Sequence, residues 1–262
     1  MQTLTSVARR PQEAGEPLRP VFFALEQRGI RARRGTATYI AGPPGGYKTG
    51  LALAWVLKLN RPTLYFSADS EPFEMVERSA AILSGDSTER VRQSPADYAG
   101  VLADLPIRMV FEDSPSYDDV VQELAAYAEV FGHFPEIIVI DNMLNLTGDK
   151  DDEWAAHRDH ARVIHRITRV TKAAVFVLAH MADDKTDPSG APQPRSKLQG
   201  KVSHLPKLIL SLAFDGEQLK TAAVKNRFGP ADPSGQEYVS MYVNPSTGRV
   251  YNTRAEMVGD VS

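Results

Sequence analysis

The stretch that most constrains this chain is residues 39–52, which read Tyr-Ile-Ala-Gly-Pro-Pro-Gly-Gly-Tyr-Lys-Thr-Gly-Leu-Ala. A strand-like run at 37–41 enters a glycine-rich turn, and Lys48 and Thr49 then open an apolar helical segment. This order is what a phosphate-binding loop requires, because glycines let successive backbone N–H groups point at phosphate oxygens and the helix N-terminus adds partial positive charge. In such a loop Lys48 reaches the β- and γ-phosphates, and the Thr49 hydroxyl binds Mg²⁺. We therefore predict a nucleotide site here.

The loop departs from the usual G-x-x-x-x-G-K-[ST] pattern at one position. Gly42 and Lys48-Thr49 fit the pattern, whereas Tyr47 stands where the last glycine is normally found. We expect a side chain there to change how closely the loop wraps the phosphates, with flexibility supplied one or two residues earlier. The competing interpretation is a Gly/Pro-rich turn that merely precedes Lys-Thr. The residues predicted to bind the nucleotide are Gly42, Pro43, Pro44, Gly45, Gly46, Tyr47, Lys48, Thr49 and Gly50.

Composition allows a full hydrophobic core and excludes several functions. The 262 residues are 42% hydrophobic, and the net charge of −3 gives no global polycationic signal for nucleic acid. The chain has no cysteine, which excludes disulfides, a zinc–thiolate site and thiol catalysis. Residues 1–20 contain no apolar signal-peptide core, and no run approaches the roughly 18 apolar residues of a membrane span. We expect a cytoplasmic protein with no membrane partner.

Strand-like and helix-like segments alternate along the chain, which favours an α/β fold with a mostly parallel, doubly wound sheet and antiparallel strands added near the C-terminus. The domain organisation that we expect is a flexible N-terminal arm at 1–20, one domain at 21–252 and a polar C-terminal tail at 253–262. The expected strands are 37–41, 64–67, 108–111, 136–142, 174–179, 206–214, 219–226 and 238–243, and the expected helices are 21–29, 49–59, 73–83, 96–105, 117–131 and 153–172.

A second motif lies about 90 residues after the loop. Residues 136–142 read Glu-Ile-Ile-Val-Ile-Asp-Asn, and four consecutive β-branched residues indicate a strand buried on both faces, as in a parallel sheet. Asp141 falls at the carboxyl end of this strand, where open α/β sheets bind their ligands. We predict that Asp141 holds Mg²⁺ opposite Thr49, as the aspartate of a Walker B strand does.

The order of these motifs resembles the RecA-like P-loop ATPase core of DnaB-type hexameric helicases, over roughly residues 20–252. The resemblance implies ATP as the nucleotide and a catalytic carboxylate after the second strand. The family pattern there is Phe-Ser-x-Glu, and this chain has Phe-Ser-Ala followed by Asp69, with Glu71 as a rival. The run Val-Phe-Val-Leu-Ala-His resembles the strand whose last residue senses the γ-phosphate, here His180, although a capping or exposed histidine is the alternative.

The most specific match is late in the chain. Residues 224–230, Val-Lys-Asn-Arg-Phe-Gly-Pro, resemble the Lys-x-Arg-x-Gly-Pro segment that such helicases insert into a neighbour's ATP site. The resemblance implies that Lys225 and Arg227 act in trans, with Arg227 as arginine finger, and that the protein forms a homo-oligomer, a hexameric ring with ATP sites between subunits. An arginine placed on the γ-phosphate lowers the barrier by stabilising developing charge. A Lys/Arg pair that simply ends a strand is the alternative.

The resemblance also implies contact with single-stranded or forked DNA. A loop at 183–201 lies where the family has its central-channel DNA loops, and it carries Lys185, Arg195, Lys197 and Lys201. Four cations among prolines and glycines can hold a phosphodiester backbone without reading sequence, although solvated loop charge is the alternative. Only some 20 to 30 residues precede the core. We therefore do not expect the family's N-terminal domain, and this compact form suits a phage-encoded member in a bacterial or phage-infected cell.

The leading hypothesis from sequence is an ATP-dependent DNA motor, in which Asp69 or Glu71 polarises the attacking water. One alternative is a metal-dependent, structure-specific DNA nuclease on the same fold, because carboxylates and histidines can hold two metal ions. Another is a mediator of recombination that binds nucleotide without hydrolysing it. The residues behind the nuclease hypothesis are Asp141, Asp149, Asp151, Asp152, Glu153, His157, Asp159, His160 and His165.

Overall fold

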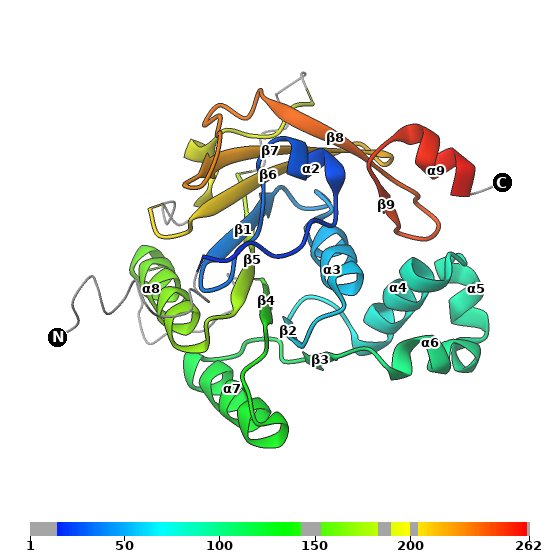
Figure 1. The fold of residues 1–262 in the computed structure, drawn as a ribbon, viewed down its shortest axis with the longest axis horizontal. Helices are drawn as coiled ribbons and strands as arrows, with labels where there is room; N and C mark the ends of the chain where they lie inside the picture. Colours follow the sequence, from blue (N-terminus) through cyan, green and yellow to red (C-terminus); the bar gives the residue numbers. More distant parts are fainter. Residues whose placement is uncertain (1–14, 143–152, 183–189, 200–203, 261–262) are drawn as a thin grey trace.

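The computed structural model describes residues 15–142, 153–182, 190–199 and 204–260, which form one nine-stranded sheet covered by helices on both faces (Figure 1). The strand order is β3-β2-β4-β5-β1-β6-β7-β8-β9. The strands are β1 (Ala37–Gly42), β2 (Thr63–Ser67), β3 (Ile107–Val110), β4 (Ile137–Asp141), β5 (Ala174–His180), β6 (Leu208–Phe214), β7 (Gln218–Asn226), β8 (Tyr238–Val243) and β9 (Val250–Tyr251).

The sheet is parallel from β3 to β6 and antiparallel from β6 to β9. The parallel strands β1, β2 and β4 are buried along their whole length, as expected for strands covered on both faces. The expected fold class, a mostly parallel α/β sheet with antiparallel strands near the C-terminus, is therefore confirmed.

Helices divide between the two faces of the sheet. One hydrophobic cluster joins the sheet to α2 and α3, and a second joins it to α7 and α8 on the other face. Within the part of the chain that is described, no helix is long and apolar enough to cross a membrane. The helices are α2 (Phe23–Gln27), α3 (Lys48–Leu59), α4 (Pro72–Ser84), α5 (Thr88–Gln93), α6 (Ala99–Ala103), α7 (Tyr117–Phe131), α8 (Glu153–Thr171) and α9 (Arg254–Asp260), with short 3₁₀ turns η1 (Pro95–Tyr98) and η3 (Arg195–Lys197).

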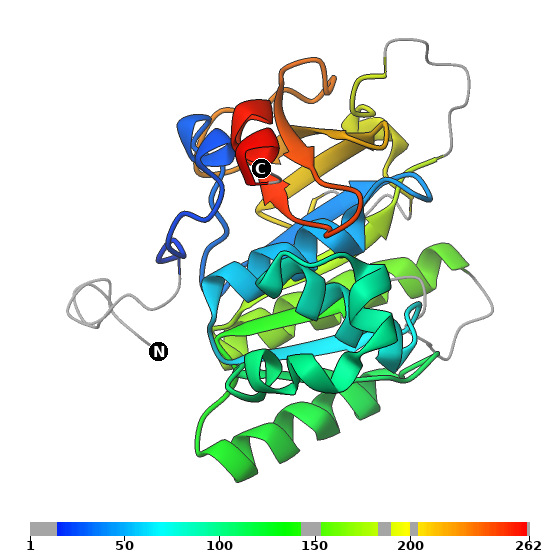
Figure 2. The same cartoon turned by 90° about the vertical axis from the view of Figure 1, so that its right-hand side faces the viewer.

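The region between α4 and β3 differs from the sequence expectation of one short helix at 96–105. Three short elements, α5, η1 and α6, stand beside α4 at one side of the molecule (Figures 1 and 2). Helix α5 begins at the cap Ser87, whose hydroxyl accepts a hydrogen bond from the Arg90 amide. Val91 and Tyr98 pack with α4 in a small separate hydrophobic cluster. Most residues around them in the sequence are polar, so the sequence does not predict this cluster.

The segment that the sequence marks as a polar tail contains a helix. Residues 254–260 form α9, which contacts β8 and β9. Its one buried side chain is Met257, and Asp260 forms an ion pair of 2.8 Å with Arg249, which in turn donates to the carbonyls of Ile82 and Leu83 at the end of α4. A single buried residue gives no periodic apolar pattern, so the sequence does not predict this helix.

Candidate nucleotide-binding site

The carboxyl ends of β1, β2, β4 and β5 meet at one edge of the sheet, beside a cleft of about 610 Å³. Ser67 of β2 pairs with Asp141 of β4, and Gly42 of β1 pairs with His180 of β5. The pairing of β4 with β5 offsets these two levels by about two residues. Helix α4 and the turn after β8 form the opposite walls. Of the residues predicted to bind nucleotide, those lining the cleft are Pro44, Gly45, Gly46, Tyr47, Lys48, Thr49 and Gly50.

The loop between β1 and α3 has the backbone of a tight phosphate-binding turn. Gly45 has a φ of 72°, and a Cβ on Gly46 would lie 2.9 Å from the Pro43 carbonyl oxygen, so these two positions require glycine. The Lys48 ammonium donates to the carbonyls of Gly42 (3.2 Å) and Pro43 (3.0 Å). Burial lowers the pKa of Lys48, and nearby acidic side chains oppose this shift. Lys48 therefore lies inside the loop, at the N-terminus of α3.

Tyr47 precedes α3 in the left-handed conformation, with φ 65° and ψ 26°. This region is unfavourable for residues with a Cβ, which explains why glycine is usual at this position. The Tyr47 hydroxyl donates a hydrogen bond of 2.7 Å to the Gly248 carbonyl, and the ring packs on Phe214 with centroids 4.9 Å apart. These contacts hold a conformation that the residue alone would rarely adopt.

The two residues predicted to hold Mg²⁺ are in direct contact. Asp141 ends β4, is 3% exposed, and is hydrogen-bonded to the Thr49 hydroxyl. The Tyr65 hydroxyl also donates to its carboxylate, at 3.1 Å. Burial raises the pKa of Asp141 from 3.8 to about 6, although both hydrogen bonds favour the charged form. A carboxylate and a hydroxyl supply only oxygen donors, which is the ligand set that Mg²⁺ prefers.

The structure separates the rival carboxylates Asp69 and Glu71. Asp69 follows β2 and lines the cleft, and its carboxylate accepts a hydrogen bond from the Asn142 side-chain amide. Glu71 is the exposed cap residue of α4 and is not among the residues that line the cleft. Sequence reasoning missed Asn142, which is 4% exposed. The sequence feature that could have identified Asn142 is its position directly after Asp141, at the edge of the sheet where polar side chains of neighbouring strands meet.

His180 ends β5 and faces the same cleft. Burial lowers its pKa, and the positive charge of Lys48 lowers it further, while Asp69 opposes the shift. The imidazole is therefore neutral near pH 7 and has one N–H to donate.

Lys225 and Arg227 lie at the opposite edge of the sheet from this cleft. Strand β7 runs antiparallel to β6, and β6 runs parallel to β1. Through these pairings Asn226 is level with Thr38, at the amino end of β1, whereas the phosphate-binding loop follows the carboxyl end. Neither Lys225 nor Arg227 lines the cleft of its own chain.

Several cations gather at this second edge. The Lys225 ammonium donates to the His204 carbonyl at 3.0 Å. Burial, followed by the positive charges of Arg227, Arg195 and Lys207, lowers the pKa of Lys225 to about 8. Arg195, predicted to contact DNA, therefore lies in the same electrostatic environment as the two residues predicted to act in trans.

Of the four cations predicted to contact DNA, the structure describes two. Arg195 and Lys197 are the exposed ends of η3. Lys185 and Lys201 lie outside the described residues.

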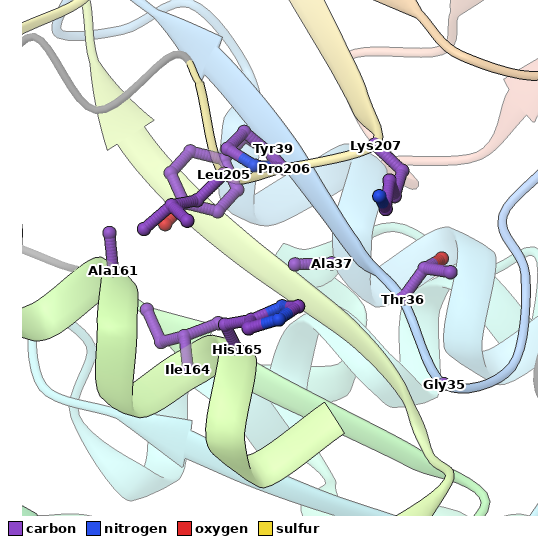
Figure 3. Close-up of a pocket in the computed structure, with 10 residues that line it drawn as sticks. All are labelled: Gly35, Thr36, Ala37, Tyr39, Ala161, Ile164, His165, Leu205, Pro206 and Lys207. Atoms are coloured by element: carbon purple, nitrogen blue, oxygen red, sulfur yellow. The ribbon is translucent and has the colours of Figure 1, made fainter. Parts of the chain in front are cut away.

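The residues behind the nuclease hypothesis do not meet in the described part of the chain, where no group of three His, Asp or Glu side chains could hold a metal ion. His160 is buried and contacts the Tyr117 ring, with centroids 5.2 Å apart. His165 lines a separate hollow of about 20 Å³ with Tyr39 and Lys207 (Figure 3). The acids at 149, 151 and 152, and the side chains of Glu153, His157 and Asp159, lie outside the described residues.

A glycine-rich loop between a parallel strand and a helix, together with a buried aspartate at the carboxyl end of another strand of the same parallel sheet, defines a P-loop nucleoside triphosphatase. The model of the AAA domain family matches residues 28–185. The chain therefore belongs to this family of P-loop ATPases. It is also 37% identical over 242 residues to the Gene 65 protein of Mycobacterium phage L5, covering 87% of this chain and 90% of that relative.

Two solved structures share the fold. A DnaB-like replicative helicase superposes with a TM-score of 0.80 at 14% identity, covering 95% of this chain, which spans 66% of that helicase chain. A second structure, of an ATPase domain alone, superposes with a TM-score of 0.81 at 16% identity, covering 96% of this chain and 97% of that domain. The expected resemblance to the RecA-like ATPase core of DnaB-type helicases is thereby confirmed.

Proposed function

We propose that this protein is an ATP-dependent DNA motor, a helicase or translocase, that works as a hexameric ring of identical subunits in the phage-infected bacterial cell. The observation that carries the proposal is the location of Lys225 and Arg227 at the edge of the sheet opposite the cleft. About four residues of extended strand, or roughly 13 Å, separate the level of Asn226 from the start of the phosphate-binding loop. Lys225 and Arg227 therefore lie away from the ATP site of their own chain, which supports a role for both in the ATP site of a neighbouring subunit.

In the proposed reaction each residue has a separate role. Lys48 and the N-terminus of α3 bind the phosphates, and Thr49 with Asp141 holds Mg²⁺, which when bound neutralises charge on the β- and γ-phosphates. Asp69, oriented by the amide of Asn142, accepts a hydrogen bond from the attacking water and aligns it with the γ-phosphate. Glu71 stays a candidate for this role only if α4 moves.

The remaining roles concern the γ-phosphate and the neighbour. Neutral His180 donates its N–H to a γ-phosphate oxygen. Arg227 and Lys225 of the neighbouring subunit supply positive charge that balances the negative charge developing in the transition state, which makes turnover depend on assembly.

The DNA part of the proposal rests on charge. Arg195 and Lys197 are exposed cations, Arg195 lies near Lys225, and Lys185 and Lys201 belong to the same segment of sequence. Such cations bind phosphodiester backbones independently of sequence and lose affinity steeply with salt. The likeness to a replicative helicase structure supports the same substrate class.

The decisive experiment mixes two inactive variants. Lys48→Ala lacks a working phosphate site but keeps its trans residues, and Arg227→Ala has the reverse defect. We expect each alone to lose ATP turnover by about 100-fold or more, because one arginine finger contributes about 10³ to 10⁵. An equimolar mixture should regain a substantial fraction of the wild-type rate, since mixed rings contain complete sites. Arg254→Ala removes an exposed arginine that pairs with Glu217 and is the matched control.

Failure of the mixture to recover, with both variants folded, would refute action in trans. A gel assay on labelled forked DNA with Mg²⁺, with and without ATP, then separates the functions. Strand separation that requires ATP supports the motor. Shortened strands without ATP would indicate the nuclease, and binding of ATP and DNA without turnover would indicate the mediator.

A further inference from the structure

The Tyr47 side chain joins two parts of the cleft that lie 201 residues apart in sequence. Its hydroxyl bonds to the carbonyl of Gly248, in the turn between β8 and β9, and its ring packs on Phe214 at the end of β6. Both contacts belong to the antiparallel end of the sheet. A residue of the phosphate-binding loop therefore anchors that loop to the C-terminal part of the domain.

Gly50 makes room for this contact, and Gly248 supplies a backbone conformation that favours glycine. A Cβ on Gly50 would lie 2.5 Å from the Tyr47 ring, a separation that non-bonded carbon atoms do not reach. Gly248 has a φ of 68°, and a Cβ there would lie 3.4 Å from the Tyr47 hydroxyl oxygen. Burial raises the pKa of the Tyr47 hydroxyl, so it stays protonated and remains a donor at any ordinary pH. The tyrosine is thus accommodated by its surroundings and is not a chance substitution on an exposed loop.

The turn that Tyr47 holds forms one wall of the nucleotide cleft. In the proposed ATP site, phosphates bind at the N-terminus of α3, beside Lys48 and Asp141. Pro245 and Thr247 of this turn line the same cleft, together with Glu74, Arg78 and Ile82 of α4. Apolar side chains beside a few polar and charged groups suit the ribose and base of a nucleotide. A nucleotide with its phosphates on the loop therefore directs its ribose and base toward the turn.

We propose that Tyr47 is a positioning residue that holds the 244–248 turn against the ribose and base of the bound nucleotide. The proposal rests on the ATP site proposed above. It assigns the loop residue that departs from the usual pattern to recognition of the nucleoside, whereas Lys48 and the loop backbone bind the phosphates. Removing the hydroxyl alone breaks the hydrogen bond between the loop and the turn but leaves the ring in place.

The test compares two ligands by calorimetry, ADP and inorganic tripolyphosphate, on wild type and Tyr47→Phe. We expect Tyr47→Phe to weaken ADP binding by about three- to tenfold, the effect of one neutral hydrogen bond, and to change tripolyphosphate binding by less than about twofold. Tyr251→Phe removes a hydroxyl bonded to Asp260 in the same C-terminal region and should change neither.

Other outcomes overturn the inference. Equal weakening of both ligands would mean that Tyr47 acts on the phosphate loop, and unchanged binding of both would mean that the hydroxyl holds nothing the nucleotide uses. Binding of neither ligand by wild type would refute the ATP site itself, which distinguishes that failure from the first two.

A second set of variants tests the same contact without the hydroxyl. Gly50→Ala forces the Tyr47 ring to move, and Tyr47→Gly removes the ring. We expect Gly50→Ala to weaken ADP binding more strongly in the wild-type background than in the Tyr47→Gly background. Equal losses in both backgrounds would contradict the contact.

Discussion

Replacing Asp141 by asparagine removes a carboxylate that is buried at the end of β4. Asparagine has almost the same shape, and its amide oxygen and nitrogen can pair with the Tyr65 and Thr49 hydroxyls. Burial raises the pKa of Asp141 from 3.8 to about 6, a difference of about two pKa units, so its ionised form destabilises the folded state by about 3 kcal/mol at neutral pH. We expect Asp141→Asn to be more stable than wild type at pH 7.5 by about 1 to 3 kcal/mol.

The sign of the pH dependence follows from the raised pKa. Below pH 3.8 the carboxyl is protonated in both the folded and the unfolded chain, so its ionisation does not change the free energy of unfolding. Between pH 3.8 and about 6 the folded chain holds its proton more tightly, so its relative stability falls as the pH rises through this window. Urea unfolding of both proteins at several pH values across and above this window should therefore show the advantage of asparagine growing with pH and levelling off above about pH 7.

Mg²⁺ and ATP provide the functional half of the experiment. Together they should stabilise wild type, because a cation offsets the buried charge, and should stabilise Asp141→Asn much less. ATP turnover by the variant should fall by at least about 100-fold. A variant that is less stable than wild type at pH 7.5, or a stability difference independent of pH, would refute the conclusion that ionisation of buried Asp141 destabilises the fold.

Two further predictions concern other parts of the domain. Gly235→Ala should lower the free energy of unfolding by about 2 kcal/mol or more, because φ is 79° and the new Cβ would lie 2.3 Å from the Pro192 carbonyl oxygen. The control is Gly216→Ala, where φ is 104° and no atom lies within 4 Å of the new Cβ, so it measures the cost of the backbone conformation alone. Equal losses of stability for the two variants in urea titrations would exclude the clash with Pro192. His180→Gln should keep ATP turnover within about fivefold of wild type, because the glutamine amide is also a neutral hydrogen-bond donor. His180→Ala has no donor and should lose about tenfold or more in turnover. Identical rates for the two variants would show that no hydrogen bond from residue 180 is used.

The core of the site could be predicted because its signals are local. Glycines at 42, 45 and 46 followed by Lys48 specify a tight turn before a helix, and a run of β-branched residues ending at Asp141 specifies a buried strand with a polar end. Both patterns depend on backbone conformation and burial, which neighbouring residues in sequence largely determine. The structure accordingly has Thr49 and Asp141 in contact although they are 92 residues apart in number.

The parts that could not be predicted depend on packing between distant segments. Helix α9 contributes one buried methionine, and Asp260 pairs with both Arg249 on the β8–β9 connection and Tyr251 of β9. Asn142 gains its role only because β2 and β4 are neighbours in the sheet, which brings it to Asp69. Sequence reasoning also recognised that Tyr47 was unusual but had no means to find Gly248, 201 residues away.

Strands β7 and β8 connect the two proposed roles of the antiparallel end of the sheet. They pair in register from Gln218 opposite Tyr242 to Ala222 opposite Tyr238. The end of β8 leads into the turn that Tyr47 holds beside the cleft, and the end of β7 leads to Arg227 at the other edge. A nine-residue strand is about 30 Å long and is stiff along its length because its neighbours share its hydrogen bonds. In the proposed ring, we expect a shift of the turn on nucleotide binding to be transmitted along this pair toward Arg227, and the order of ATP binding around the ring to depend on Tyr47.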